Sequence, residues 1–294
     1  MRGMRGVTDR DGRARGPTAF VLSSGRNLGA VQVGMLRALV ERDVVPDLVV
    51  GCSVGAINGA GFAEDPTLGR IERMEEVWRS TEAKDLLPRP WKLPPAVSLA
   101  RRIEAIHPVD GLLRLIAQTM DARTFDELAV PLHVVATDVV DACETWFDRG
   151  PLLAPLLASA AVPAMFPAVE IAGRRYLDGA VVNDVPVQHA VDLGARTVYV
   201  LEAGSFWHPW TEPRRPADSA IQAYSIARRH RFQRELDGLP DTVDVHVLPH
   251  GDPPRLRLRD MSHAPQLMAA AHQASTTYLD EALGQRGARP KTST

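Results

Sequence analysis

The sequence predicts an α/β protein in which buried strands alternate with helices. Twice, a short apolar segment of strand length is followed by a turn of small residues and then by a segment with helical spacing. The first of these units spans residues 18–41 and the second spans residues 47–60. Strands that alternate with helices are typical of α/β domains. At 294 residues, without an internal repeat or a linker, the chain is best interpreted as one such domain.

Composition and charge exclude several classes of protein. The formal net charge is −2, which provides no overall positive field for binding nucleic acid. Cys52 and Cys143 are too few for a disulfide framework and have no metal-ligand spacing, so we predict a reduced, cytoplasmic protein with no metal site. No apolar stretch is long enough to cross a bilayer, so any membrane contact is expected to be peripheral. The oligomeric state stays open.

The predicted domain spans residues 18–284. Residues 1–17 are rich in Arg and Gly and lack the apolar segment of a secretory signal, so we interpret them as a disordered leader. Residues 285–294 follow the last predicted helix and are interpreted as a flexible tail.

The first unit begins with the strand 18–22, which leads through the turn 23–29 into a helix at 30–41. A small-residue turn before a helix places free backbone N–H groups at the carboxyl edge of a sheet. Such groups bind an anion or a developing oxyanion. The alternative is a plain connection between a strand and a helix. The G-x-G-x-x-G spacing of a dinucleotide site is not met.

The second unit contains the motif G-x-S-x-G at residues 51–55. The apolar run before it is a predicted buried strand, and the segment after it begins a helix. Ser53 therefore lies on a tight strand-to-helix turn that lifts its hydroxyl clear of the sheet, while Gly51 and Gly55 permit close backbone approach. Ser53 is a candidate nucleophile, and the motif requires a base, an oxyanion site and an acyl pocket elsewhere in the chain.

The remaining elements follow from apolar periodicity. We predict helices at 70–80, 112–120, 220–236 and 264–283, and strands at 132–138, 145–147, 197–201 and 243–248. The small apolar segment 151–166 suits a buried helix stopped by Pro163 and Pro167. His133 alternates with apolar residues inside its strand and is interpreted as a core histidine. The arginines of the helix at 220–236 are expected to lie mostly on solvated faces; they are Arg228, Arg229, Arg231 and Arg234.

Proline and aromatic residues mark two irregular segments. The Pro-rich segment 87–95 is interpreted as a linker or a mobile cap over a pocket. Its Trp91, and the cluster Phe206, Trp207 and Trp210, are candidates for membrane contact, with core packing or a pocket rim as the alternative.

Asp178 provides the second chemical signal. It follows a short strand and begins the turn Asp178-Gly179-Ala180, which can hold a carboxylate in a fixed pose. Asp-Gly alone is a common turn, so this position by itself does not make Asp178 catalytic.

Three motifs in this order resemble the patatin-like phospholipases, a family of lipid acyl hydrolases with a Ser-Asp dyad. The motifs are Gly29-Ala30-Val31-Gln32-Val33-Gly34 with the turn before it, the elbow at 51–55, and Asp178-Gly179-Ala180. Residues 136–138, 159–167 and 262–263 also look family-like, so the similarity runs from about Thr18 to the last helix. The resemblance implies a three-layer α/β/α sandwich with a mostly parallel central sheet.

The resemblance also implies a mechanism. Ser53 is expected to act as the nucleophile and Asp178 as the general base, with an acyl-enzyme formed on Ser53 and released by water. The expected substrate is a lipid or another acyl ester, and the dyad requires no cofactor or metal. A conventional Ser-His-Asp hydrolase is the alternative, and it requires a histidine beside Ser53; His189 and His263 are the first candidates.

The turn at 24–29 departs from the family pattern, because Arg26 stands where a glycine is expected and Leu28 where a basic residue is common. The resemblance assigns the oxyanion hole to Gly25, Arg26 and Asn27. It assigns the supporting elbow and turn glycines to Gly29, Gly51, Gly55 and Gly179. A positive φ at Arg26 would cost roughly 1 kcal/mol or more, although the guanidinium could instead face an anionic head group. The alternative to an active esterase is therefore a weakly active or inactive patatin-fold protein that binds lipid or has a regulatory role.

Overall fold

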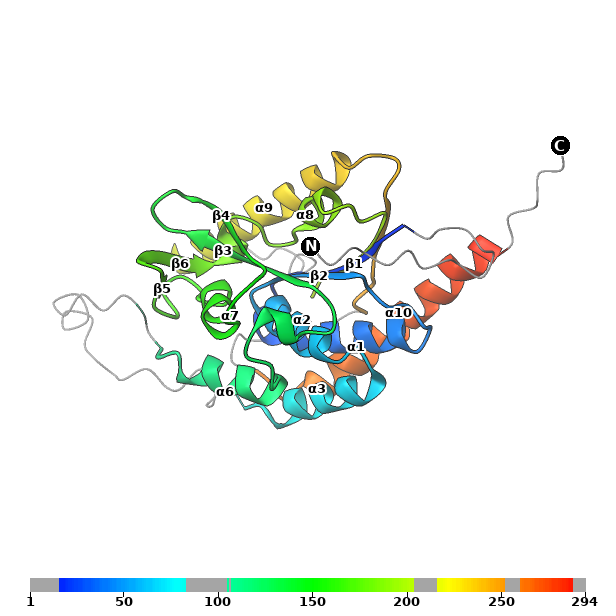
Figure 1. Ribbon diagram of the computed structural model, residues 1–294, viewed down its shortest axis with the longest axis horizontal. Helices are drawn as coiled ribbons and strands as arrows, with labels where there is room; N and C mark the ends of the chain where they lie inside the picture. Colours follow the sequence, from blue (N-terminus) through cyan, green and yellow to red (C-terminus); the bar gives the residue numbers. More distant parts are fainter. Residues whose placement is uncertain (1–15, 83–104, 106, 204–215, 252–259, 288–294) are drawn as a thin grey trace.

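The computed structural model describes residues 16–82, 105, 107–203, 216–251 and 260–287. An eight-stranded sheet lies at its centre, with helices on both faces (Figure 1). The strands are β1 (Thr18–Leu22), β2 (Leu48–Cys52), β3 (Leu132–Asp138), β4 (Cys143–Phe147), β5 (Val169–Ile171), β6 (Arg174–Asp178), β7 (Thr197–Leu201) and β8 (Asp244–Val247). The helices are α1 (Gly29–Val40), α2 (Val54–Glu64), α3 (Leu68–Ser80), α6 (Asp110–Thr119), α7 (Leu153–Ser159), α8 (Val187–Asp192), α9 (Pro216–Asp237) and α10 (Ala264–Gly287). Three short 3-10 turns are η1 (Arg26–Leu28), η2 (Phe125–Glu127) and η3 (Gly179–Val181).

The sheet is mostly parallel, as expected. Its strands lie in the order β5-β6-β3-β2-β1-β7-β8, and β4 also pairs with β3. Five neighbouring strands, β3, β2, β1, β7 and β8, are parallel to one another. Strands β4 and β6 run antiparallel to β3. Helices α1, α2, α3, α6 and α10 lie on one side of the sheet, and α8 and α9 lie on the other (Figure 1). This arrangement confirms the predicted three-layer α/β/α fold.

The two faces of the central strands explain the three layers. In β1, Phe20 and Leu22 belong to the core beneath α1 and α2, whereas Ala19 and Val21 pack with residues of α8 and α9 such as Phe232. All five β1 residues are buried. A strand covered on both faces appears in sequence as a continuous apolar run, which is why β1, β2 and β7 were predictable.

The last helix, α10, packs along α1. A Cβ built on Gly34 would lie 2.2 Å from the backbone oxygen of Met268, so glycine at this position lets the two helices approach closely. The helix ends at Gly287, and so it includes the first three residues of the predicted tail. The leader up to residue 15, the tail from residue 288, and the irregular segments with Trp91 and Phe206 lie outside the described residues.

The small apolar segment 151–166 was predicted to contain a buried helix stopped by Pro163 and Pro167, and it contains the short helix α7 (Leu153–Ser159). Helix α7 ends at Ser159. Beyond it the chain turns to pair with other elements, because the oxygen of Ala161 accepts a hydrogen bond from the Asp178 N–H at 3.0 Å. Pro163, four residues after Ser159, has no N–H to bond the Ser159 oxygen, which agrees with a helix that ends at Ser159. Within the part of the chain that the structure describes, no helix is both long and apolar enough to span a bilayer.

Candidate functional site

Ser53 and Asp178, 125 positions apart in the sequence, are in direct contact. The Ser53 Oγ donates a hydrogen bond to Asp178 Oδ2 at 2.7 Å, and the two residues are 4% and 3% exposed. The sheet register brings them together. Cys52, at the end of β2, lies opposite Val135 of β3, and Asp178, at the end of β6, lies opposite the next β3 residue, Ala136.

The Ser53 backbone is strained. Its φ of 56° and ψ of −124° lie in a region that residues with a side chain rarely occupy, at a cost of about 1–3 kcal/mol. The Ser53 N–H donates to Ser159 Oγ at 2.8 Å, which ties the elbow to the end of α7. A Cβ on Gly55 would lie 2.4 Å from the backbone oxygens of Leu22 and Ser23, so only glycine allows α2 to begin this close to β1. The surroundings therefore hold Ser53 in an elbow conformation.

Three hydrogen bonds position Asp178. Its Oδ1 accepts the Ala180 N–H at 2.8 Å, and its backbone oxygen accepts Thr137 Oγ1 at 2.7 Å. The Asp178 N–H donates to the backbone oxygen of Ala161 at 3.0 Å. A Cβ on Gly179 would lie 2.5 Å from the Val135 oxygen, so the chain passes close to β3 directly after the carboxylate. Oδ2 is thereby directed toward Ser53.

Burial sets the proton affinity of this carboxylate. Loss of hydration raises the pKa of Asp178 from 3.8 to about 6, although the hydrogen bonds from Ser53 and Ala180 and the charge of Arg228 lower it in part. An aspartate with such a pKa is mostly ionised at neutral pH and holds a proton more tightly than an exposed aspartate does. This is the property that a general base requires.

The turn at 24–29 lies against the residue that follows Ser53. A Cβ on Gly29 would lie 2.5 Å from a methyl carbon of Val54, and one on Gly25 would lie 3.6 Å from the other methyl and 2.4 Å from Ala203 Cβ. Arg26 begins the 3-10 turn η1, and a 3-10 conformation has a negative φ, typically about −50 to −70°. The expected cost of a positive φ at Arg26 therefore does not arise, and that expectation is corrected. Asn27 Nδ2 donates to the oxygen of Asp260 at 3.0 Å, which ties the turn to the segment before α10.

A buried polar network, which sequence analysis did not identify, lies beneath this turn. Trp78 Nε1 donates to Asn58 Oδ1 at 3.1 Å, and Asn58 Nδ2 donates to the oxygen of Gly29 at 3.0 Å and to Gln32 Oε1 at 2.9 Å. Gln32 Nε2 in turn donates to the oxygens of Ser23 at 2.7 Å and of Leu201 at 3.1 Å. The network joins α1, α2, α3 and β7 to Ser23, just before the turn at 24–29, and to Gly29 at its end. Single polar residues in apolar helices were its only signal in the sequence.

Arg228 is the exception to the prediction that the α9 arginines lie mostly on solvated faces; Arg231 and Arg234 are exposed. The Arg228 side chain is 10% exposed and forms an ion pair with Asp184, whose side chain is 2% exposed. Arg228 Nη2 also donates to Ser24 Oγ at 2.7 Å. Nothing in the spacing of the arginines distinguishes Arg228 from its neighbours, because its burial depends on where α9 crosses the sheet.

The two histidines considered for a Ser-His-Asp triad have other partners. His189 Nε2 lies 3.0 Å from His133 Nδ1, and its ring stacks on Trp146 at a centroid distance of 3.5 Å. Burial lowers the pKa of His189 to about 4, so the ring is neutral at physiological pH. His263 Nδ1 lies 3.2 Å from an oxygen of Asp260 at the start of α10.

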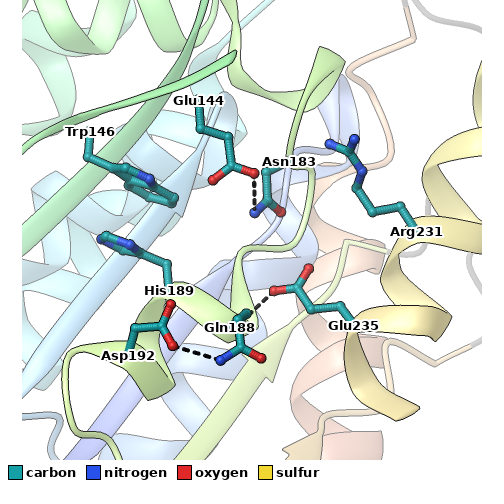
Figure 2. A pocket seen from close by; sticks show the side chains of 8 residues that line it. All are labelled: Glu144, Trp146, Asn183, Gln188, His189, Asp192, Arg231 and Glu235. Carbon is teal, nitrogen blue, oxygen red and sulfur yellow. Dashed lines mark hydrogen bonds between the residues drawn. The ribbon is translucent and has the colours of Figure 1, made fainter. Parts of the chain in front are cut away.

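A pocket of about 330 Å³ opens between β4, α8 and α9 (Figure 2). Its lining is polar and includes no aliphatic side chain; the residues are Glu144, Trp146, Asn183, Gln188, His189, Asp192, Arg231 and Glu235. Asn183 Nδ2 donates to Glu144 Oε1 at 3.1 Å, and the Gln188 N–H donates to Glu235. Burial raises the pKa of Glu235 to about 7. Such a lining does not suit an acyl chain. Two lining residues connect the pocket to the dyad: Trp146 packs on Cys52, Val135 and Ala180, and the Asn183 N–H donates to the oxygen of Gly179 at 2.8 Å.

Comparison with known proteins identifies relatives of part of the chain. It is similar to an uncharacterized NTE family protein of Mycobacterium tuberculosis, with 30% identity over 179 residues that cover 60% of this chain and 46% of that protein. It is 28% identical to the human patatin-like phospholipase domain-containing protein 6 over 189 residues, which are 64% of this chain and 13% of that protein. Among solved structures, VipD from Legionella pneumophila aligns with 94% of this chain and 69% of its own, at 14% identity and a TM-score of 0.46.

The chain thus spans less than half the length of the two sequence relatives. Family membership rests on the match to a family model described as patatin-like phospholipase, which covers residues 20–191. This match includes the turn at 24–29, the Ser53 elbow and Asp178, and it extends over more than half of the chain. The chain therefore belongs to the patatin-like phospholipase family.

Proposed function

We propose that this chain is a serine hydrolase that cleaves the carboxylic esters of lipids through an acyl-enzyme on Ser53. The observation that carries the proposal is the hydrogen bond from Ser53 Oγ to Asp178 Oδ2 at 2.7 Å, made by a serine with a φ of 56°. A hydroxyl on a strained elbow, next to a buried carboxylate of raised pKa, is the arrangement of an activated nucleophile. Family membership supports a lipid ester as the substrate.

The proposed reaction has two halves. As Ser53 Oγ bonds to the ester carbonyl carbon, its proton passes to Asp178 Oδ2, and the carbonyl oxygen becomes an oxyanion that backbone N–H groups of Gly25, Arg26 and Asn27 stabilise. Collapse of this intermediate expels the alcohol, which takes the proton from Asp178. Water then attacks the acyl-enzyme and gives a proton to Asp178; as the bond to Ser53 Oγ breaks, Asp178 returns this proton to Ser53 Oγ and the fatty acid leaves.

The alternative, a patatin-fold protein with little activity, was based on Arg26. Its physical argument was the cost of a positive φ, and Arg26 instead lies in the 3-10 turn η1. Every non-proline residue of such a turn carries a backbone N–H whatever its side chain is. An active hydrolase is therefore favoured over a lipid-binding or regulatory scaffold.

Covalent labelling with a fluorophosphonate tests this proposal. The wild-type protein is expected to be labelled, and Ser53→Ala is not, because the probe phosphonylates an activated serine. Equal labelling of the two proteins would exclude Ser53 as the nucleophile, and no labelling of either would favour the inactive scaffold.

Ester hydrolysis tests the base separately. With p-nitrophenyl esters of short and long acyl chains, Asp178→Asn is expected to lower kcat by roughly 10²- to 10⁴-fold, the usual contribution of a general base. Unchanged turnover in this variant would contradict the role of Asp178. Comparison of the chain lengths measures whether the enzyme prefers lipid-like acyl groups.

A further inference from the structure

Arg228 of α9 joins two segments of the site that are far apart in the sequence. One segment is the turn at 24–29, which begins at Ser24, and the other is the chain after Asp178, which leads to Asp184. Arg228 forms an ion pair with the Asp184 carboxylate and donates to Ser24 Oγ at 2.7 Å. The Ser24 N–H in turn donates to the backbone oxygen of Asp184 at 3.2 Å. The three residues form a closed set of contacts between the oxyanion turn and the segment that carries the base.

These contacts are buried. Ser24 and Asp184 are 5% and 2% exposed, and the Arg228 guanidinium also lies 5.3 Å from the ring centre of Tyr224, one helical turn earlier in α9. A planar guanidinium can bind a carboxylate and a hydroxyl at once because its five N–H donors have a fixed fork geometry. A lysine at this position would have a single nitrogen and could not hold both groups in the same way.

From this geometry we propose that Arg228 is a positioning residue of the site, which holds the turn at 24–29 in register with the Ser53–Asp178 pair and balances the charge of Asp184. The inference rests on the proposed hydrolase function. Placement of the turn matters because oxyanion donors act only at about 2.7–3.1 Å from the developing charge. A displacement of about 1 Å can lower turnover by 10²-fold.

The charge of Arg228 also bears on Asp178. The ionisable groups around Asp178 are Cys52 of β2, Asp184 of the following segment, and Tyr224 and Arg228 of α9. The Arg228 charge lowers the pKa of Asp178, and the Asp184 charge raises it. Loss of Arg228 alone removes the first effect and leaves the second, so the pKa of Asp178 should rise and activity should shift to higher pH.

Four variants separate placement of the turn from charge. Ser24→Ala removes the contact with the turn and keeps the ion pair. Arg228→Gln removes the cation and leaves the buried Asp184 carboxylate unpaired. The double variant, Arg228→Gln with Asp184→Asn, removes both charges, so no buried carboxylate is left unpaired to destabilise the fold. Arg234→Gln is the matched control, because Arg234 is an exposed arginine of the same helix.

Kinetics with a p-nitrophenyl ester at several pH values give the first readout. Ser24→Ala is expected to lower kcat about tenfold or more with little change in KM and no shift of the acidic limb of the pH profile. Arg228→Gln should lower kcat by about 10²-fold and move the acidic limb to higher pH, and the double variant should return the limb toward its wild-type position. A purely structural role would not move the limb. Wild-type kcat and an unshifted limb in folded Arg228→Gln would overturn the proposal.

Amide hydrogen exchange of the peptide over residues 23–29 gives a second readout that needs no activity. Exchange should be faster in Ser24→Ala and Arg228→Gln than in the wild type and in Arg234→Gln. If the wild type fails to react with a fluorophosphonate, the proposed function is lost while this readout still tests the positioning role. The positioning role would be contradicted if residues 23–29 exchanged at the wild-type rate in both Ser24→Ala and the double variant.

Discussion

At the scale of single residues, the proposed role of the buried Asp178 carboxylate as the base predicts that activity depends on pH. Its pKa is raised to about 6 by burial, and only the ionised form can accept the Ser53 proton. We therefore expect kcat/KM for a p-nitrophenyl ester to rise about tenfold per pH unit below pH 6 and to level off above it. A profile with a midpoint near pH 4, the value of an exposed aspartate, would contradict this prediction.

The same carboxylate should reduce stability. Because its pKa is about 6 in the folded protein and 3.8 when exposed, the native state binds more protons than the unfolded state between these values. The free energy of unfolding therefore falls as pH rises from about 4 to 6 and stays lowered above that. Asp178→Asn, which can still accept the Ala180 N–H, should gain of the order of 3 kcal/mol at pH 8 and nothing near pH 4.

Urea denaturation at the two pH values measures this effect. Asp126→Asn is a suitable control because Asp126 is exposed, and it should change the free energy of unfolding by less than about 0.5 kcal/mol. An equal gain for Asp178→Asn at pH 4 and pH 8 would show that ionisation is not its cause.

At the scale of elements, the Gln32–Asn58–Trp78 network supports the turn from below. Asn58→Leu removes the partner of the Trp78 indole, of Gln32 Oε1 and of the Gly29 oxygen at one position. Each buried polar group left without a partner costs about 1–3 kcal/mol, so we expect a loss of roughly 3 kcal/mol in urea denaturation. Fluorophosphonate labelling should also slow, because the turn loses its anchor.

The matched control for this prediction is Ser80→Ala. Ser80 Oγ donates to the oxygen of Glu76 at 2.8 Å on the exposed side of α3, so its removal should cost less than about 0.5 kcal/mol. If Asn58→Leu were as mild as Ser80→Ala, the network would not contribute to stability.

At the scale of the whole molecule, the long C-terminal helix α10 covers α1 and thereby the layer that carries the turn. Gly34→Ala would place a Cβ 2.2 Å from the Met268 oxygen, and a backbone atom of α10 cannot rotate away as a side chain can. We expect the free energy of unfolding to fall by about 1–3 kcal/mol, despite the better helix propensity of alanine.

Gly284→Ala provides the contrast in the same pair of helices. Nothing lies within 4 Å of a Cβ at Gly284, so this substitution should stabilise α10 by up to about 1 kcal/mol. Thermal unfolding of the two variants measures both effects. A gain in stability for Gly34→Ala would show that α10 is not docked this closely on α1.

Local patterns made much of the fold predictable from the sequence. The strand at 18–22, the strand at 132–138 and its hairpin partner at 145–147 are confirmed as β1, β3 and β4. Such elements are predictable because an apolar run or a two-residue alternation lies within the segment itself, whichever elements cover it in the fold. The helix stopped by Pro163 is confirmed as α7, but no local pattern encodes the hydrogen bonds that Ser53 and Asp178 donate to Ser159 and Ala161.

By itself, the sequence determined the α/β class, the elbow that presents Ser53, and the turn that presents Asp178, since each depends on residues within a few positions of one another. Only the tertiary structure decided that Ser53 and Asp178 touch, because neighbouring positions on β3 bring the ends of β2 and β6 together. The tertiary structure alone also decided the burial of Arg228 beside Ser24, because an arginine 204 positions away comes into reach only where α9 crosses the sheet.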